Sequence, residues 1–290
     1  MDNNNNIRIM KTKILLLLLI IGFQSDVIIS QENENKGKLF IIGGGSRPSS
    51  MVDRIITESG LNNGGYGIIL PMSSAEPDSA VYYSRAQFYD KGIKNIYGLS
   101  FSKDEKLTAS KLDSIKNAKL VYISGGDQNK FMDIVAGTDI EKAIHEAYKN
   151  GSLVGGTSAG AAVMSKMMIT GQELKHPEYS STFRNIESEN IEIKTGLGML
   201  TNIIIDQHFV KRSRYNRLLS AIIEYPEMTG IGIDESTAIL INGSTIEVVG
   251  DSQVIVISNP QHSKKTYNDK IGATGLVVDI YLPGDFFTIN

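Results

Sequence analysis

The strongest chemical signal in this 290-residue chain is a serine flanked by glycines. The segment Gly156-Thr157-Ser158-Ala159-Gly160 follows an apolar pair, Leu153-Val154, and precedes residues 161–168, whose composition predicts a helix. On a sharp turn between a strand and a helix, a serine hydroxyl is exposed and the first amides of the helix can stabilise an oxyanion. The spacing alone is common, but in this context it predicts a nucleophilic serine rather than an ordinary glycine-rich turn.

A serine nucleophile needs a base, and the chain has four histidines. His208 directly follows residues 202–207, a predicted strand, so it belongs at the same sheet edge as Ser158. His145 lies in an amphipathic predicted helix, and His176 and His262 lie in polar segments. We therefore expect His208 to be the general base, although a single histidine can also be purely structural.

The acid that would orient this histidine has two candidates. Glu173 follows Ser158 by fifteen residues, and Glu235 ends a predicted strand over residues 230–235. Either carboxylate could instead be solvated, and the polar neighbours of Glu173 favour that interpretation for it. Three arginines follow the histidine, at positions 212, 214 and 217. Guanidinium groups near a nucleophile are typical of carboxylate binding, although a solvated basic helix end would have the same pattern.

These residues must be positioned by alternating strands and helices. Strands are predicted at residues 38–42, 66–71, 95–99, 119–123 and 153–154, and helices at 49–59, 75–91, 107–117 and 139–150. Continuously apolar strands between helices are typical of a parallel sheet covered on both faces. Such sheets bind ligands at the carboxyl ends of their strands, where the glycine-rich segments at 43–45, 125–126 and 156–160 should gather.

The C-terminal part has a different pattern. Residues 237–241 and 245–249 flank Asn242-Gly243 and predict a hairpin, and further strands are predicted at 253–258 and 275–282. We expect this antiparallel part to extend or cover the main sheet. Residues 37–290 are therefore treated as one domain.

Composition excludes several classes of protein. The chain is 41% hydrophobic, enough for a full core, and its net charge of −3 without a long basic run argues against nucleic-acid binding. Cysteine is absent, which excludes thiol and iron–sulfur chemistry, and no cofactor or metal is expected. Gly43-Gly44-Gly45-Ser46 fails the dinucleotide pattern because Pro48 occupies the third glycine position.

The N-terminus predicts export. Arg8, Lys11 and Lys13 precede an apolar run at residues 14–21, which is too short to span a bilayer. Residues 1–30 therefore match a secretory signal, followed by a leader to about residue 36. We expect a periplasmic or extracellular protein with no membrane attachment after cleavage.

Several separate segments together resemble a known family. They are Ile41-Ile42-Gly43-Gly44-Gly45, Gly125-Gly126-Asp127-Gln128, residues 155–161, Asp206-Gln207-His208-Phe209 with the three arginines, and residues 230–235. In this order they resemble the serine peptidases related to cyanophycinase and aspartyl dipeptidase, a match far more specific than the serine motif alone. The resemblance implies a three-layer α/β fold, akin to class I glutamine amidotransferases.

The resemblance also implies roles for single residues. Ser158, His208 and Glu173 would be catalytic, with Glu235 held in reserve, and Gly126 and Ala159 would supply the oxyanion amides. The substrate groove would be lined by Gln128, Asp206, Gln207, Arg212, Arg214 and Arg217. Asp127 or Asp206 could meet a substrate guanidinium.

The implied activity is that of a serine-type exopeptidase. The family's substrate is cyanophycin, a poly-aspartate backbone with arginine on each side-chain carboxyl, and cleavage yields β-aspartyl-arginine dipeptides. A polar excursion at residues 175–195 departs from the family and leaves room for other aspartyl or isoaspartyl peptides as substrates. The sequence is also compatible with a non-catalytic peptide- or carbohydrate-binding relative and, less well, with an α/β-hydrolase esterase. It is compatible with a homodimer.

Overall fold

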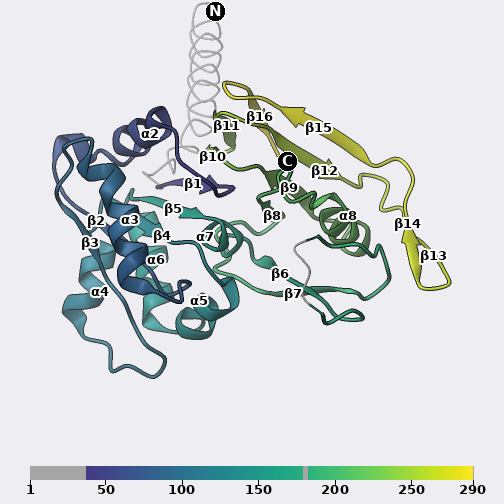
Figure 1. Cartoon of the computed structure of the whole chain (residues 1–290), viewed down its shortest axis with the longest axis horizontal. Helices are drawn as coiled ribbons and strands as arrows, with labels where there is room; N and C mark the ends of the chain where they lie inside the picture. The colour runs from purple at the N-terminus through teal and green to yellow at the C-terminus, as the bar shows by residue number, and fades with distance from the viewer. Residues whose placement is uncertain (1–36, 179–181, 290) are drawn as a thin grey trace, which may run out of the picture. The chain divides into compact units, whose positions relative to one another are not determined.

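The computed structural model describes residues 37–178 and 182–289, so the predicted signal and leader lie outside the described part. Within it, an eight-stranded sheet has the order β16-β11-β10-β1-β5-β4-β2-β3 (Figure 1). Its parallel strands are β1 (Lys38–Ile42), β5 (Leu153–Thr157), β4 (Leu120–Ile123), β2 (Gly67–Leu70) and β3 (Ile96–Gly98). The antiparallel strands β10 (Thr237–Asn242), β11 (Thr245–Gly250) and β16 (Phe286–Thr288) extend it beyond β1.

Helices cover both faces of this sheet. One face packs on α2 (Ser49–Ser59) and α3 (Pro77–Tyr89), through Phe40, Ile69 and Tyr122 of the strands. The other face packs on α4 (Ala109–Lys116), α5 (Gln128–Val135), α6 (Asp139–Lys149) and the short α7 (Ala159–Ala162). A single turn of 3-10 helix, η1 (Leu61–Asn63), follows α2. The expected three-layer α/β architecture with a mostly parallel sheet is confirmed.

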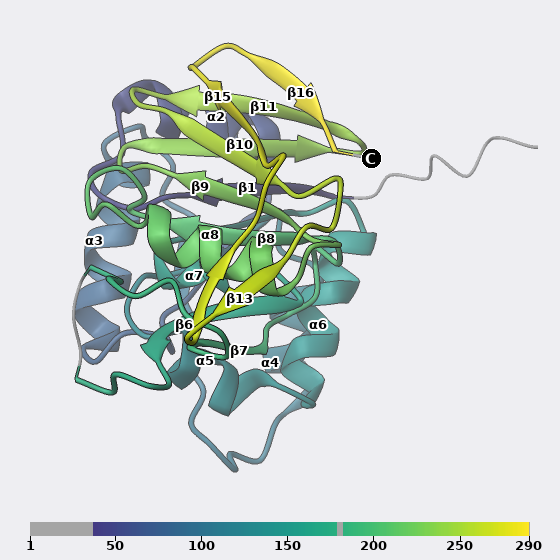
Figure 2. The same ribbon diagram turned by 90° about the vertical axis from the view of Figure 1, so that its right-hand side faces the viewer.

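A second sheet has the order β15-β12-β9-β8 and lies against the first. It consists of β8 (Ile203–Gln207), β9 (Thr229–Ile233), β12 (Val254–Ser258) and β15 (Val277–Tyr281). Ile205, Ile231 and Val254 face the core shared with the large sheet, whereas Ile204 and Ile255 pack under α8 (Tyr215–Glu224). Figure 2 shows α8 in front of these strands, with β10 and β11 above them. The predicted C-terminal strands therefore extend the large sheet and also cover it. β10, β11 and β16 extend it, whereas β12 and β15 belong to the sheet that covers it.

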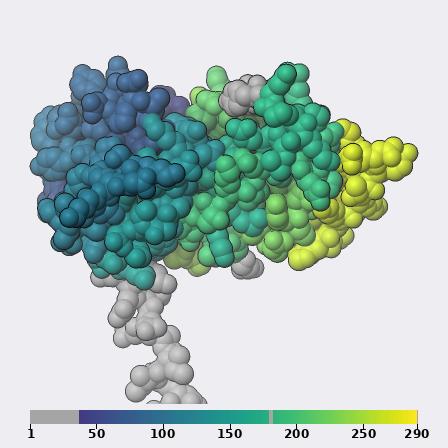
Figure 3. Space-filling model, turned by 90° about the horizontal axis from the view of Figure 1, so that it is seen from below, coloured from purple at the N-terminus to yellow at the C-terminus, as the bar shows by residue number. Residues whose placement is uncertain are grey.

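Two small hairpins complete the described part. The strands β6 (Met167–Glu173) and β7 (Ile191–Thr195) pair with each other, as do β13 (Lys265–Tyr267) and β14 (Lys270–Gly272). In Figure 3 the C-terminal strands, in yellow, form one end of the surface, next to the green residues of the second half. No helix in residues 37–178 or 182–289 is long and apolar enough to cross a membrane.

One predicted element is wrong. Residues 161–168 do not continue as a helix after the serine, because α7 ends at Ala162 and β6 begins at Met167. Between them the chain pairs with a distant segment: Leu197 N–H donates to Val163 O at 2.7 Å, and Leu200 N–H donates to Met164 O at 3.0 Å. These long-range hydrogen bonds override the local helix propensity of the alanine and methionine residues.

Candidate active site

Ser158 lies at the carboxyl end of β5, in the middle of the large sheet. Its φ of 54° and ψ of −112° are strained for a residue with a side chain, as expected of an exposed serine on a strand–helix turn. The glycines of the motif permit this turn, because a Cβ at Gly156 would lie 2.1 Å from Gly160 O and one at Gly160 would lie 2.3 Å from Ile123 O. The G-x-S-x-G spacing is therefore a requirement of backbone packing.

The structure brings His208 to this serine across fifty residues of sequence. His208 follows β8, and its Nε2 lies 2.8 Å from Ser158 Oγ, while its Nδ1 lies 2.7 Å from Glu235 Oε1. A carboxylate only accepts hydrogen bonds, so Nδ1 carries the proton and donates it to Glu235. Nε2 is then free to accept the hydrogen bond of the Ser158 hydroxyl, which is the arrangement a general base requires.

The expectation that Glu173 orients the histidine is corrected by this geometry. Glu173 ends β6, and its carboxylate accepts hydrogen bonds from Asn185 Nδ2 at 3.0 Å and Asn190 Nδ2 at 2.9 Å. These partners hold the pKa of Glu173 below its usual value, against the effect of burial. Glu173 therefore anchors its own loop, and Glu235, the reserve candidate, is the carboxylate that contacts His208.

The loop after β1 explains the glycine run at residues 43–45. A Cβ at Gly44 would lie 2.3 Å from Cε1 of His208, and one at Gly45 would lie 2.8 Å from Cβ of Glu235. Both glycines have positive φ, at 120° and 71°. The run does not fit the dinucleotide pattern, and in the structure it packs against the imidazole and its carboxylate instead.

His208 has a pKa below its ordinary value of 6.5. Burial is the largest cause, since the imidazolium would lose its hydration, and the positive charges of Arg212 and Arg214 act in the same direction. The hydrogen bond from Nδ1 to Glu235 acts in the opposite direction, because it stabilises the charged ring. The imidazole therefore stays neutral, and able to accept a proton, to a lower pH than an ordinary histidine.

A cavity of about 300 Å³ opens in front of Ser158. We call it the catalytic cavity; its lining comes from the loop after β4, from β6, and from the segment that follows β8. The lining residues are Gly126, Asp127, Gln128, Asn129, Ser158, Thr170, Gly171, Gln172, Gln207, Arg212, Arg214 and Arg217. All but one of the residues expected to bind substrate therefore lie together beside the serine.

Asp206 is the exception and corrects an expectation. Its side chain is fully buried, with 0% exposure, and Arg217 donates to both carboxylate oxygens, from Nε at 2.7 Å and from Nη2. Asp206 therefore cannot meet a substrate guanidinium, and it fixes the orientation of Arg217 instead. Arg214 donates to Gln207 through Nη1, so this second arginine is also positioned by its neighbours.

Arg212 differs from the other two arginines. It is exposed, and the described residues provide no hydrogen-bond or ion-pair partner for its guanidinium. Asp127 also lines the cavity, where its side chain caps α5 by accepting from Asn129 N–H at 2.8 Å. Within the described part of the chain, the cavity therefore has one unpaired cation, Arg212, and two arginines oriented by hydrogen bonds. It also has the carboxylate of Asp127, one oxygen of which accepts the hydrogen bond from Asn129.

The two residues expected to supply oxyanion amides lie on either side of the serine. Gly126 lines the catalytic cavity with φ of 139°, and a Cβ there would lie 2.1 Å from Ser73 O. Ala159 is the first residue of α7, where a backbone N–H has no partner inside the helix.

Gln128 is held by β6, because its Nε2 donates to Ile169 O at 3.0 Å and Thr170 O at 2.7 Å.

Strand β6 supplies the functional surface that sequence reasoning missed. Thr170, Gly171 and Gln172 of this strand line the catalytic cavity. The β-branched pair Ile169-Thr170 ahead of Gly171 was a strand signal that the preceding alanines obscured. Residues 191–195, the end of the predicted polar excursion, form β7 and pair with β6. The excursion therefore supports one wall of the cavity.

Comparisons with known proteins agree with this site. The sequence model of peptidase family S51 matches residues 39–249. A cyanophycinase of Synechococcus elongatus is 28% identical over 279 residues, which cover 90% of this chain and 81% of the relative. A cyanophycinase of Nostoc sp. (strain PCC 7120 / SAG 25.82 / UTEX 2576) is 31% identical over 213 residues, covering 72% of this chain and 68% of the relative.

A solved structure shows the same fold. The peptidase from an acI-B1 Actinobacterium superposes with a TM-score of 0.64 at 22% identity, covering 88% of this chain and 98% of that one. The fold and the sequence matches together define a peptidase. The chain belongs to peptidase family S51.

We predict that Gly44→Ala lowers kcat/KM by about 10²-fold, because the new methyl group displaces the imidazole from Ser158. The measurement is steady-state peptidase kinetics on folded protein. Gly60→Ala is the matched control, since Gly60 also has positive φ, 71°, but an added Cβ would meet nothing within 4 Å. Equal activity of the two variants would contradict the packing argument.

We predict that histidine NMR titration gives His208 a pKa below 6.5. Arg212→Ala should raise this pKa, because a repelling positive charge is removed, and Glu235→Gln should lower it further, because the stabilising carboxylate is lost. Lys149→Ala, which removes an exposed cation at the end of α6, should leave it unchanged. A shift of the opposite sign in either variant would refute this account of the site's electrostatics.

Proposed function

We propose that this peptidase is a serine-type exopeptidase that cleaves cyanophycin to β-aspartyl-arginine dipeptides. The observation that carries the proposal is the chain of contacts from Ser158 through His208 to Glu235, facing a cavity lined by three arginines. The similarity to two cyanophycinases over most of the chain supports the choice of substrate.

The proposed reaction follows from the positions of the protons. His208 Nε2 takes the Ser158 proton as Oγ attacks the scissile carbonyl carbon, and the amides of Gly126 and Ala159 receive the developing oxyanion. The C–N bond then breaks as His208 returns the proton to the leaving amine. Water, activated by the same imidazole, hydrolyses the acyl-enzyme and restores the serine. Glu235 keeps its hydrogen bond from Nδ1 throughout and stabilises the imidazolium.

The charges of the cavity fit this substrate. Each unit of cyanophycin carries a carboxylate and a guanidinium, and Arg212 is the exposed cation available to a carboxylate. Asp127 is the carboxylate that remains in the cavity for a guanidinium, since Asp206 is buried against Arg217. Other aspartyl or isoaspartyl peptides share the carboxylate but lack the guanidinium, so they satisfy only part of this surface.

We further propose that the protein is exported and acts on polymer outside the cell that makes it. The support is the sequence alone, with its basic residues ahead of an apolar run at residues 14–21. The test is fractionation of cells that express the full chain, with N-terminal sequencing of the mature protein. Retention of an uncleaved chain in the cytoplasm would refute export and leave the peptidase proposal unaffected.

Purified protein incubated with cyanophycin should release soluble β-Asp-Arg, detected by mass spectrometry over time. Ser158→Ala should lower kcat by roughly 10⁴–10⁶-fold, as expected when a covalent nucleophile is removed. Ser110→Ala, at an exposed serine on α4, is the matched control and should behave as wild type. If the protein hydrolyses isoaspartyl dipeptides but releases no β-Asp-Arg from cyanophycin, its substrate is a small peptide and not the polymer. Unchanged turnover by Ser158→Ala would refute the proposed mechanism, because the reaction would then not need the Ser158 hydroxyl.

Glu235→Gln should lower kcat by about 10²–10⁴-fold, because a neutral amide cannot stabilise the imidazolium or fix its tautomer in the same way. Glu173→Gln is the matched substitution at the carboxylate that does not contact His208. It should change kcat by less than about tenfold while lowering thermal stability through its loop. The two variants are compared by kinetics and thermal unfolding. The reverse order of kinetic effects would restore Glu173 as the orienting acid.

A further inference from the structure

A second and larger cavity lies at the same edge of the large sheet as the catalytic cavity. Its volume is about 630 Å³, and its lining includes Pro71, Asp78, Val81, Tyr82, Arg85 and Ser100. We call it the α3 cavity, because most of these residues belong to α3. Pro71 follows β2 and Ser100 follows β3, so the cavity opens near the carboxyl ends of both strands. Nothing in the proposed reaction uses it.

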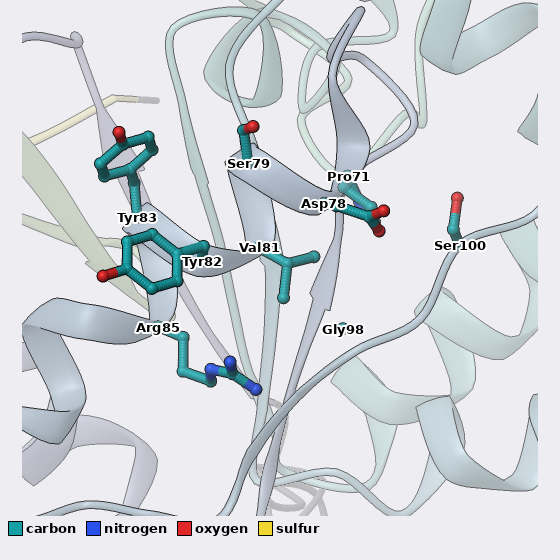
Figure 4. A pocket seen from close by; sticks show the side chains of 9 residues that line it. All are labelled: Pro71, Asp78, Ser79, Val81, Tyr82, Tyr83, Arg85, Gly98 and Ser100. Atoms are coloured by element: carbon teal, nitrogen blue, oxygen red, sulfur yellow. The ribbon is translucent and has the colours of Figure 1, made fainter.

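One face of α3 gives this cavity two opposite charges. Asp78, Tyr82 and Arg85 are spaced as i, i+4 and i+7, so they share a face of the helix, with the two charged residues about 10 Å apart along it. Figure 4 shows Asp78 beside Pro71 at one end, Tyr82 and Arg85 at the other, and Val81 between them. Val81 also packs directly against Gly98, where an added Cβ would lie 2.6 Å from it, so one apolar side chain lies between the two charged ends of the cavity.

These charged groups are available to a ligand. Among the described residues Asp78 has no ion-pair or side-chain hydrogen-bond partner, and it is exposed. The Arg85 guanidinium lies 5.1 Å from the centre of the Tyr89 ring and has no carboxylate partner in the same part of the chain. Tyr82 is 61% exposed and lies edge to face against Tyr83, with the ring centroids 5.2 Å apart. A carboxylate at one end of the cavity and a guanidinium at the other match a ligand that carries both charges.

The α3 cavity and the catalytic cavity are joined by one short loop. Residues 71–76 connect β2 to α3, and Ser73 O in this loop accepts a hydrogen bond from Asp127 N–H at 2.8 Å. Lys130 Nζ donates to Ser74 O at 2.5 Å, and a Cβ at Gly126 would lie 2.1 Å from Ser73 O. The loop therefore packs directly on the segment that carries the expected oxyanion amide.

The distance between the two cavities suits an extended chain. Ser158 follows β5, and β2 and β3 lie two and three strands away in the sheet. With neighbouring strands roughly 4.8 Å apart, the ends of β2 and β3 lie about 10–15 Å across the sheet from the end of β5. An extended backbone covers this distance with about three to five residues. The backbone of a two-unit substrate does not reach the α3 cavity from the serine, whereas that of a longer polymer does.

We propose that the α3 cavity is a second binding site for the polymeric substrate, distinct from the site of cleavage. The proposal rests on the proposed function, because it takes cyanophycin as the substrate. Asp78 would pair with a guanidinium of a distant unit at one end of the cavity, and Arg85, beside Tyr82 at the other end, would pair with a carboxylate. These contacts are the same in the ground state and the transition state, so they lower KM without changing kcat.

The test compares a short and a long substrate with the full-length protein. The variants are Asp78→Asn, Arg85→Gln and their combination, which remove each charge while keeping a polar side chain of similar size. For oligomers of ten or more β-Asp-Arg units, KM should rise about two- to fivefold for each single variant, the range expected for exposed ion pairs. It should rise about tenfold for the double variant, with kcat unchanged. For the dimer of β-Asp-Arg, both constants should equal those of wild type.

Matched controls separate this site from a general effect of charge. Asp90→Asn changes the C-terminal end of the same helix, and Lys149→Gln changes α6; both residues are exposed. Neither control should change KM for the long oligomer. Calorimetry of the long oligomer binding to Ser158→Ala, with and without the double substitution, measures affinity without turnover and should show the same loss. This loss should diminish at high salt, because exposed charges are screened.

The outcomes distinguish the two proposals. If wild type cleaves the polymer and the double variant binds and cleaves long oligomers equally well, the α3 cavity is not a substrate site and the proposed function stands. If the variants lose kcat on the dimer as well, their effect is on the catalytic cavity and the second site is refuted. If wild type cleaves no β-Asp-Arg substrate of either length, the proposed function fails and this inference fails with it.

Discussion

The site depends on the approach of the Gly43–Gly44 backbone to the second sheet. Gly43 O accepts a hydrogen bond from His208 N–H at 2.8 Å, and Gly44 O accepts one from Ser236 N–H at 2.9 Å. The residue before this pair, Ile42, accepts from Ser158 N–H at 3.0 Å. One loop therefore fixes the serine, which belongs to the large sheet, relative to the histidine and its acid, which belong to the smaller one. A side chain at position 44 would occupy the place of the imidazole, so the geometry requires glycine there.

The charged residues near the Gly44–His208 contact are of two kinds, a buried ion pair and an exposed arginine. Asp206 is buried and neutralises Arg217, and removing one partner of such a pair typically costs about 3–5 kcal/mol. This interior pair orients the guanidinium without giving the cavity its charge. Arg212 supplies the exposed positive charge, and it also contributes to lowering the pKa of His208. The positive charge that suits a substrate carboxylate therefore adds to the effect of burial, and both lower the pKa of the base.

The sequence predicted the structure correctly where the residues of a single segment determine its conformation. Apolar runs ending in glycines marked β1, β4 and β5 to within a few residues, and the strand ends placed Ser158 and His208 at one edge. The helix predicted for residues 161–168 is absent because their pairing partners, Leu197 and Leu200, are more than thirty residues away. The acid could not be chosen for the same reason, since Glu173 and Glu235 both follow plausible elements. Which of them meets the imidazole depends on the parallel pairing of β8 with β9.

The parallel arrangement of the strands also bears on the proposed second binding site. The loop before α3 contacts the loop after β4, where Asp127 N–H donates to Ser73 O, and it takes no part in the contacts among Ser158, His208 and Glu235. A weak contact at the α3 cavity is sufficient for a polymer, because once one unit is held at the serine the next contact is intramolecular and benefits from a high effective concentration. If the α3 cavity binds the polymer as proposed, substitutions on α3 would change the preferred length of substrate, whereas the Gly44–His208 packing would stay the same.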